Sequence, residues 1–293
     1  MLIHEPAWLS YPEEVKLANG RPRFIPFDCP VEQFERYFTD STRMVVICNP
    51  SNPAGRVYTR EELEYLYSVC RPKGIYVMVD EAYSDFMVDD VFVSMVNVVP
   101  DKDGIIVTNS LSKSMGISGW RIGYVISSED VAYSILKLSQ HLITRPPTVL
   151  MLYLAEYFDD ILRITLPQAR AVTYKRMEVE AYCKQIGLDT LSGSATFYLF
   201  VSIGVYQGSS LDLALYLLAR YRISVVPGLA YGPSVDRYVR VGVGAEDLDD
   251  IKACLSTIKG VVERDEYDFC IVQSELRGLG AKRFEVTNRE SYA

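Results

Sequence analysis

The chain has 293 residues, of which 49% are hydrophobic and 23% charged, a composition typical of a globular protein with a large core. Its net charge of −8 argues against nucleic-acid binding, and its two histidines exclude a multi-histidine metal site. The six cysteines lack zinc-finger spacing, no apolar run is long enough to span a membrane, and the first residues do not resemble a signal peptide. We therefore expect a cytoplasmic protein of about two domains, with reduced thiols and without a membrane, metal or nucleic-acid partner.

Short apolar runs and helical patterns alternate in the first half of the chain. Strands are predicted at 44–48, 75–79, 104–108 and 124–126. Thr59 and Glu62 have the spacing of a capping box, which predicts a helix that runs through Val69. Strands that are apolar throughout and separated by helices are typical of a mainly parallel sheet covered on both faces. The sequence therefore predicts a large α/β domain over residues 1–165.

The pattern changes after the helix-breaking pair Pro146-Pro147. Helices are predicted at 151–158, 169–186 and 247–262, and strands at 197–202, 223–226 and 238–243. Short strands flanked by helices are typical of an α+β domain, which we assign to residues 166–293. No element is predicted after Glu263, where the sequence is more polar.

A lysine follows the strand at 104–108 in a segment rich in hydroxyl and glycine residues. Ser110 and Ser112 precede Lys113, and a guanidinium follows at Arg121. Hydroxyl and guanidinium groups suit an anionic phosphate, and a lysine beside such a site can form a Schiff base with an aldehyde cofactor. The alternative is a solvated surface charge, which is the usual state of an isolated lysine.

Two polar segments follow the strands at 44–48 and 75–79. Asp80-Glu81 could belong to a Walker B sequence, but the chain lacks the Gly-x-x-x-x-Gly-Lys-Ser/Thr loop that an ATPase of this type needs. An aspartate at the carboxyl end of a parallel strand can instead hold a cofactor. Asn52 lies in the turn at 49–55 and should emerge at the same sheet edge as Asp80. Taken alone, these segments are also explained by a strand end and a tight turn.

Together, the three segments resemble motifs of the class I/II aminotransferases, which are fold-type-I pyridoxal-phosphate enzymes. The sequence matches Asn-Pro-x-Asn-Pro-x-Gly, then Asp-Glu-x-Tyr, then Ser-x-Ser-Lys-x-x-x-x-x-Gly-x-Arg-x-Gly. The intervals are 28 residues from Asn52 to Asp80 and 33 from Asp80 to Lys113. The resemblance implies an aspartate aminotransferase-like large domain with a mainly parallel sheet, a smaller α+β C-terminal domain, pyridoxal 5′-phosphate as cofactor, and a homodimer.

The resemblance also implies roles for the residues that would surround the cofactor's ring. Lys113 would form the Schiff base and then move the α-proton of the substrate. Asp80 would pair with the pyridine nitrogen and keep it protonated. Asn52 and Tyr83 would hydrogen-bond the phenolic oxygen and lower the pKa of the Schiff base.

Other matching residues would hold the remaining groups. The phosphate would be bound by Ser110, Ser112 and Arg121. Trp8 would stack on the ring, since the segment from Glu5 to Tyr11 resembles the family's stacking segment. Arg240 would bind the substrate's α-carboxylate, and it fits that place better than Arg237 because it precedes the apolar-Gly step of the strand.

The implied function is transfer of an amino group between an amino acid and a 2-oxo acid, as part of amino-acid metabolism. A decarboxylase, lyase, racemase or oxidase of the same fold is the alternative, because these reactions share their first steps. In the family a further segment precedes the stacking aromatic, and none lies upstream of Met1 here. A second alternative is therefore an N-terminally truncated, non-catalytic relative. The sequence does not identify the amino acid or the 2-oxo acid.

Overall fold

The computed structural model describes residues 1–88 and 92–278, and it divides into two compact units. The first consists of Met1–Tyr174 together with Gly193–Thr196, and the second of Lys175–Ser192 and the chain from Phe197 onward. The two units divide after Tyr174, within the long helix Thr148–Ile186. The domain boundary predicted between residues 165 and 166 lies in the same helix and stays a prediction.

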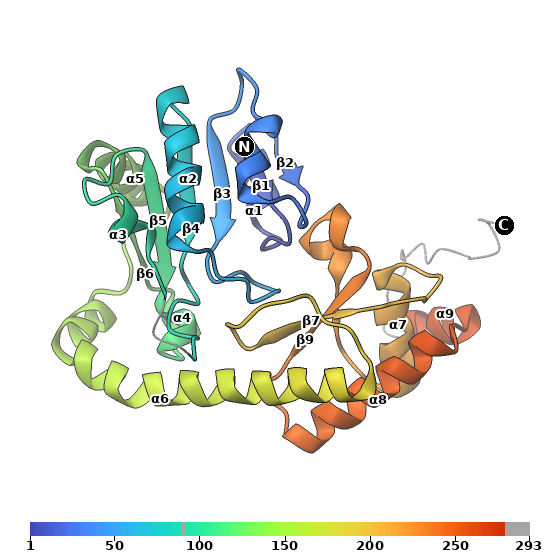
Figure 1. Ribbon diagram of the computed structural model, residues 1–293. Coiled ribbons are helices and arrows are strands. Elements are labelled where there is room, and N and C mark those ends of the chain that lie inside the picture. The colour runs from blue at the N-terminus through green and yellow to red at the C-terminus, as the bar shows by residue number, and fades with distance from the viewer. Residues whose placement is uncertain (89–91, 279–293) are drawn as a thin grey trace. The chain divides into compact units, whose positions relative to one another are not determined.

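A six-stranded sheet lies at the centre of the first unit (Figure 1). Its strands are β1 (Leu2–His4), β2 (Arg23–Ile25), β3 (Met44–Cys48), β4 (Tyr76–Asp80), β5 (Ile105–Ser110) and β6 (Gly123–Ser127). They are ordered β2-β1-β3-β4-β5-β6, and every neighbouring pair is parallel except β5 and β6. The predicted mainly parallel α/β fold is confirmed, although β1 and β2 were not predicted.

The helices of this unit cover both faces of the sheet. They are α1 (Tyr11–Leu17), α2 (Arg60–Cys70), α3 (Met95–Val98), α4 (Leu111–Ser114), α5 (Glu129–Leu142) and the first part of α6 (Thr148–Ile186). Successive side chains of a strand point to opposite faces. Val45 accordingly packs in one buried cluster with Leu63 of α2, whereas Val46 packs in another with Val15 of α1. The edge strand β6 differs from the prediction of full burial, because half of its Tyr124 side chain is exposed.

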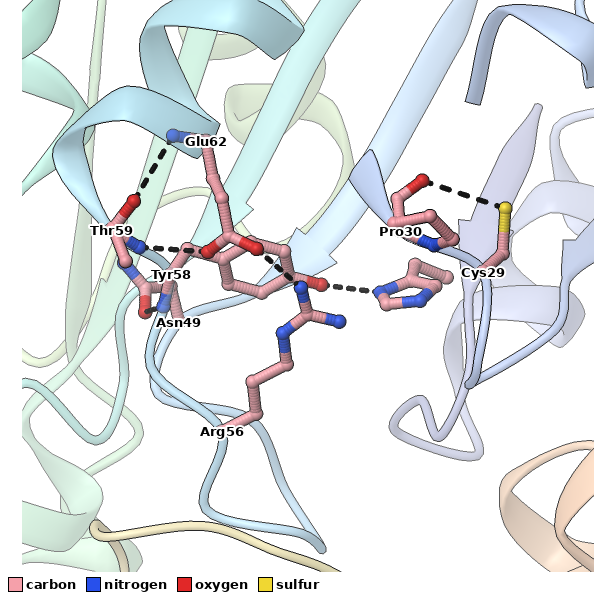
Figure 2. Close-up of polar contacts among 8 residues, drawn as sticks. Cys29, Pro30, Asn49, Arg56, Tyr58, Thr59 and Glu62 are labelled. Carbon is pink, nitrogen blue, oxygen red and sulfur yellow. Dashed lines mark hydrogen bonds and ion pairs between the residues drawn. The ribbon is translucent and has the colours of Figure 1, made fainter. Parts of the chain in front are cut away.

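Helix α2 begins at the predicted capping box. The Glu62 amide donates to Thr59 Oγ1 at 3.2 Å, and the Thr59 amide donates to Glu62 Oε2 at 2.9 Å (Figure 2). The two bonds satisfy amides that a helix start leaves without intrahelical partners. The capping prediction is confirmed.

The two helices predicted at 151–158 and 169–186 both lie within α6, which joins two helices across a kink. The kink is at Tyr157, whose backbone angles are non-helical (φ −113°, ψ 19°), and the second helix begins earlier than predicted. Pro167 lies inside the helix without ending it. Proline removes one backbone donor and crowds the preceding turn, but it already has a helical φ, so tertiary packing can carry the helix past it.

The second unit contains an antiparallel sheet of three strands in the order β7-β9-β8. Its elements are β7 (Tyr198–Ser202), α7 (Ser210–Tyr221), β8 (Val226–Pro227), β9 (Tyr238–Gly242), α8 (Leu248–Glu263) and α9 (Phe269–Gly278). The strand predicted at 223–226 is wrong in extent, since only Val226 of that range is in β8. Helix α9 lies in the segment for which nothing was predicted, and the predicted domain's residues 279–293 lie outside the described part of the chain. None of the described helices, including the 39-residue α6, combines the length and apolar character needed to cross a membrane.

Candidate active site

The carboxyl ends of three neighbouring strands bring the predicted cofactor residues to one edge of the sheet. Asp80, the last residue of β4, pairs with Cys48 of β3 and with Thr108 of β5. The Asn49 amide donates to the Asp80 carbonyl at 2.9 Å, so the turn that carries Asn52 leaves the sheet beside Asp80. Because ligands of open α/β sheets bind outside the carboxyl ends of the strands, this edge is the candidate active site.

The Asp80 carboxylate accepts two hydrogen bonds and has no cationic partner among the described residues. Tyr11 Oη donates to Oδ2 at 2.5 Å, and the Ala82 amide donates to Oδ1 at 3.1 Å. Burial raises the pKa of Asp80 above its ordinary value, and these two bonds act in the opposite direction. A desolvated carboxylate of this kind favours a cationic ligand group, such as a protonated ring nitrogen.

Tyr11 is a site residue that the sequence analysis missed. Burial raises its pKa well above the ordinary tyrosine value, so the phenol stays protonated and donates to Asp80. Its ring meets the Trp8 ring edge to face, with centroids 5.5 Å apart. Its place in the segment Trp8-x-x-Tyr11 at the start of α1 marks Tyr11 as a neighbour of the stacking residue, but this local pattern does not indicate Asp80 as its partner. Trp8 itself is 39% exposed, so its indole is open to a ligand.

Lys113 follows β5 in the short helix α4. Ser110 is the N-cap of this helix, and its hydroxyl accepts a hydrogen bond from the Ser112 amide at 3.3 Å. The Lys113 side chain is half-buried, and within the described chain its Nζ forms neither a hydrogen bond nor an ion pair. An amine held near a sheet edge without a partner is available for reaction with a ligand.

The three predicted phosphate ligands lie at the end of the β5–β6 pair. Ser110 pairs with Gly123, and the Leu111 amide donates to the Ile122 carbonyl at 3.2 Å, so Arg121, which precedes Ile122, lies near this end of the strand pair. A Cβ on Gly123 would lie 2.5 Å from the Asn109 carbonyl oxygen, so glycine permits this close pairing. The exposed Arg121 donates from Nη1 to the Ser118 carbonyl at 2.9 Å.

The turn that carries Asn52 is tied to α2 and β1. Arg56 Nη2 lies 2.6 Å from Glu62 Oε1, and the guanidinium stacks 4.5 Å from the centre of the Tyr58 ring (Figure 2). Tyr58 Oη lies 2.5 Å from Nδ1 of His4. Burial, with the Arg56 charge as a second cause, lowers the pKa of His4 to about 3, so the imidazole is neutral. Asn52 is therefore held in a rigid turn, and only 5% of its surface is exposed.

Arg240 and Arg237 lie in or beside β9 of the second unit, in different surroundings. The Arg237 guanidinium donates to the carbonyls of Gly204, Tyr206 and Gly208 at 2.6–3.0 Å, which fixes it to the backbone. The Arg240 guanidinium stacks on the ring of Tyr198, with Cζ 4.1 Å from the ring centre. The role of Arg240 as the substrate ligand stays a prediction.

The comparison with known proteins identifies the family. The model of the family "Aminotransferase class I and II" matches residues 1–258. The chain belongs to this family. The match covers the whole sheet edge described above and extends through β9, so the predicted family, fold class and enzyme class are confirmed.

The relatives of this aminotransferase family member are longer proteins. A putative aminotransferase, YugH, of Bacillus subtilis is 27% identical over 88% of the chain and 68% of its own length. A probable aspartate/prephenate aminotransferase of Aquifex aeolicus is 30% identical over 79% of the chain, which spans 62% of that protein. The structure of an aromatic aminotransferase from Pyrococcus horikoshii has a TM-score of 0.83 at 26% identity, covering 90% of this chain and 73% of the other.

Glu81, beside Asp80, is a buried acid that the sequence analysis gave no role. Its Oε1 accepts hydrogen bonds from Ser94 Oγ at 3.0 Å and from the Met95 amide at 2.8 Å. Burial, and to a lesser extent the neighbouring Asp80 charge, raises its pKa to about 7. In this family member Glu81 therefore caps α3 and titrates near neutral pH.

We expect Glu81→Gln to remove a pH-dependent loss of stability. Between about pH 4.5 and 7 the folded chain retains a proton that the unfolded chain has released, so the free energy of unfolding falls as the pH rises. Glutamine keeps the acceptor oxygen without titrating. Denaturant unfolding should show the variant gaining about 3 kcal/mol relative to the unmodified chain between pH 5 and pH 8. A stability difference that is constant with pH would contradict this assignment.

Proposed function

We propose that the chain binds pyridoxal 5′-phosphate through Lys113 and transfers an amino group between an amino acid and a 2-oxo acid. The observation that carries the proposal is a pair of groups at one sheet edge. Asp80 is a buried carboxylate without a cation, and Lys113 is a half-buried amine without a partner in the described chain. The first suits a protonated pyridine nitrogen and the second an aldehyde carbon.

The other residues of the edge fit the remaining groups of this cofactor. Asn52 and Tyr83 are buried polar side chains that would bind the phenolic oxygen. The phosphate would lie between the hydroxyls and the guanidinium at the end of the β5–β6 pair, on Ser110, Ser112 and Arg121. The exposed Trp8 indole would cover one face of the ring. When bound, the cofactor supplies an electrophilic carbon and an electron-accepting ring, which stabilises negative charge at the α-carbon of the substrate.

Three side chains would then carry out the work of the protein. Asp80, held by Tyr11, keeps a proton on the ring nitrogen by its negative charge. Lys113 would hold the cofactor through its amine and, when that amine is free, would move the α-proton of the substrate. Arg240 binds the α-carboxylate with its planar pair of donors, and the Tyr198 ring beneath it limits the orientations of the guanidinium.

The substrates belong to this proposal at the level of their class. The relatives are named for aspartate, prephenate and aromatic amino acids, and each of these compounds carries a carboxylate that an arginine can bind. We therefore propose α-amino acids and 2-oxo acids as substrates, without a choice among side chains.

A half-reaction distinguishes amino transfer from the other reactions of this fold. The chain loaded with pyridoxal phosphate is mixed with single amino acids, and the cofactor's absorption spectrum and the products are followed. We expect the cofactor to be converted into its pyridoxamine form with one equivalent of 2-oxo acid, and to be restored by adding a 2-oxo acid. Release of carbon dioxide, loss of a side-chain group or racemisation without this conversion would contradict the proposed reaction.

The exposed apolar face of α5 and α6 supports a homodimer as the working form. Large apolar side chains lie more than half exposed in these helices and in the link between them, at Leu136, Leu138, Leu142, Ile143, Val149, Leu152 and Ile164. Monomeric proteins rarely leave a face of this kind in contact with water. Sedimentation equilibrium should show a dimer for the unmodified chain and a monomer for the double variant Leu142→Glu, Leu152→Glu. A monomeric unmodified chain would contradict the proposed homodimer.

We also propose the cytoplasm as the location. All six cysteines, each within the described part of the chain, are free thiols, and four of them are buried. Free thiols persist in a reducing compartment. Cell fractionation with an antibody against the chain tests the location, and recovery from a secreted or membrane fraction would contradict it.

A further inference from the structure

Four residues, Gly193–Thr196, belong to the first unit although the chain on either side of them belongs to the second. We call this segment the strap. It contacts the two turns of the first unit that carry Asn52 and Tyr83. These are the two side chains assigned above to the phenolic oxygen of the cofactor, and they come from different strand ends, β3 and β4.

Backbone hydrogen bonds join the strap to the turn around Asn52. The amides of Ser194 and Ala195 donate to the Gly55 carbonyl at 2.9 and 3.2 Å. Gly55 has a left-handed φ of 74°, and its own amide donates to the Ser51 carbonyl at 2.7 Å, which completes the turn. Gly55 is thus the point at which the strap and the Asn52 turn are joined.

The approach of the two backbones leaves no space for a side chain at Gly193. A Cβ built there would lie 2.0 Å from the Ala54 carbonyl oxygen and 2.6 Å from the Gly55 carbonyl carbon. The contacted atoms are backbone atoms of a buried turn, so they cannot move aside as the end of a flexible side chain would. Any larger residue at 193 must push the strap and the Asn52 turn apart.

The other end of the strap holds the turn that carries Tyr83. The Thr196 amide donates to the Phe86 carbonyl at 3.0 Å, and the Phe86 amide donates to the Tyr83 carbonyl at 2.9 Å. Ala195 and Thr196 are completely buried. Because buried backbone groups must be paired, loss of one of these bonds would disturb the position of both turns.

We propose that the strap is a positioning element that fixes the position of Asn52 relative to Tyr83. Gly193 is the residue that permits the close approach of the strap to the Asn52 turn. The proposal rests on the proposed function, in that these two side chains bind the phenolic oxygen. The strap itself would touch no cofactor atom, and its effect would reach the cofactor through the two turns.

Gly193→Ala should change a spectroscopic property of the bound cofactor. Hydrogen bonds to the ionised phenolic oxygen favour the deprotonated linkage to Lys113, so misplaced donors should raise the pH midpoint of the visible absorption band by about one unit. Cofactor affinity, measured by titration of the same band, should fall by about tenfold. In an Asn52→Ala background, Gly193→Ala should shift the midpoint much less than it does alone, because the strap then has one donor fewer to position.

Two further variants separate positioning from general stability. A Cβ on Gly278 would meet no atom within 4 Å, so Gly278→Ala should leave midpoint and affinity unchanged. Ala195→Gly loosens the strap without a clash and should shift the midpoint in the same direction by a smaller amount, which keeps the test available if Gly193→Ala does not fold. An unchanged midpoint in both strap variants, whatever their melting temperatures, would overturn the proposal.

Hydrogen exchange of the cofactor-free chain tests the strap without the cofactor. Gly193→Ala, or Ala195→Gly if the first does not fold, should speed exchange at the Gly55 and Phe86 amides, which donate within the two turns. Faster exchange in a chain that shows no cofactor band would support the role of the strap in holding the two turns and refute the proposed function. A normal band with unchanged exchange at both amides would overturn the proposed role of the strap without contradicting the proposed function.

Discussion

Replacement of Lys113 by alanine is expected to abolish the visible absorption band of bound pyridoxal phosphate and to lower the rate of amino transfer by at least about 10³-fold. The amine is the only side-chain group of α4 that can both link the cofactor and exchange a proton with the substrate. The cofactor should still bind without a covalent bond, because the carboxylate at the end of β4 and the groups at the end of the β5–β6 pair remain. Absorption spectra and single-turnover kinetics measure the two effects.

The matched control for this variant is Lys73→Ala. Lys73 lies outside the candidate site, and its exposed ammonium is 3.4 Å from Glu35. Exposed ion pairs of this kind contribute little to stability, so spectrum and rate should stay those of the unmodified chain. A visible band that survives in Lys113→Ala and is lost in Lys73→Ala would overturn the assignment.

Asp80→Asn should leave the shape of the site intact and lower kcat by at least about 10²-fold. Asparagine can accept the Tyr11 hydrogen bond, but it lacks the negative charge that keeps a proton on the ring nitrogen. Affinity for pyridoxal phosphate should fall as well, since a buried charge pair would be lost. Steady-state kinetics at saturating cofactor separate the effect on rate from the effect on binding.

The pH dependence of cofactor binding provides a second measure of Asp80. Burial raises the pKa of this carboxyl, so protonation should weaken cofactor binding at a higher pH than an exposed aspartate would. The acid limb of the binding profile should vanish in Asp80→Asn. The control is Asp103→Asn, in which an exposed aspartate loses its ion pair with Arg71. Equal kcat values in Asp80→Asn and Asp103→Asn would contradict the role of Asp80.

The sequence predicted the part of the fold that local pattern determines. β3, β4 and β5 each begin with an apolar run that polar residues follow, so both the strands and the edge at which they end were predictable. β1 and β2 have three residues each, too few for a period to show. β1 pairs in parallel with β3, and β2 pairs in parallel with β1, so the place of β1 in the sheet depends on residues far along the chain and that of β2 depends on β1.

The same distinction applies to the candidate site. Lys113, Asp80 and Asn52 lie next to predicted strand ends and within recognisable motifs. Tyr11 acts on Asp80 across 69 residues of sequence, and nothing in its local sequence indicates that partner. Gly193 is required by the backbone of a turn formed by residues 51–55, which only the folded chain brings near it. Long-range contacts therefore account for what the sequence did not reveal.

The position of the cofactor's covalent link tests the central claim most directly. The chain is loaded with pyridoxal phosphate, reduced with borohydride to fix the link as a stable amine, digested, and analysed by peptide mass spectrometry. We expect one phosphopyridoxyl group per chain, on Lys113, and none on the peptide that carries Lys73. A modification at another lysine, or none after loading and reduction, would contradict the assignment of this sheet edge as a pyridoxal-phosphate site.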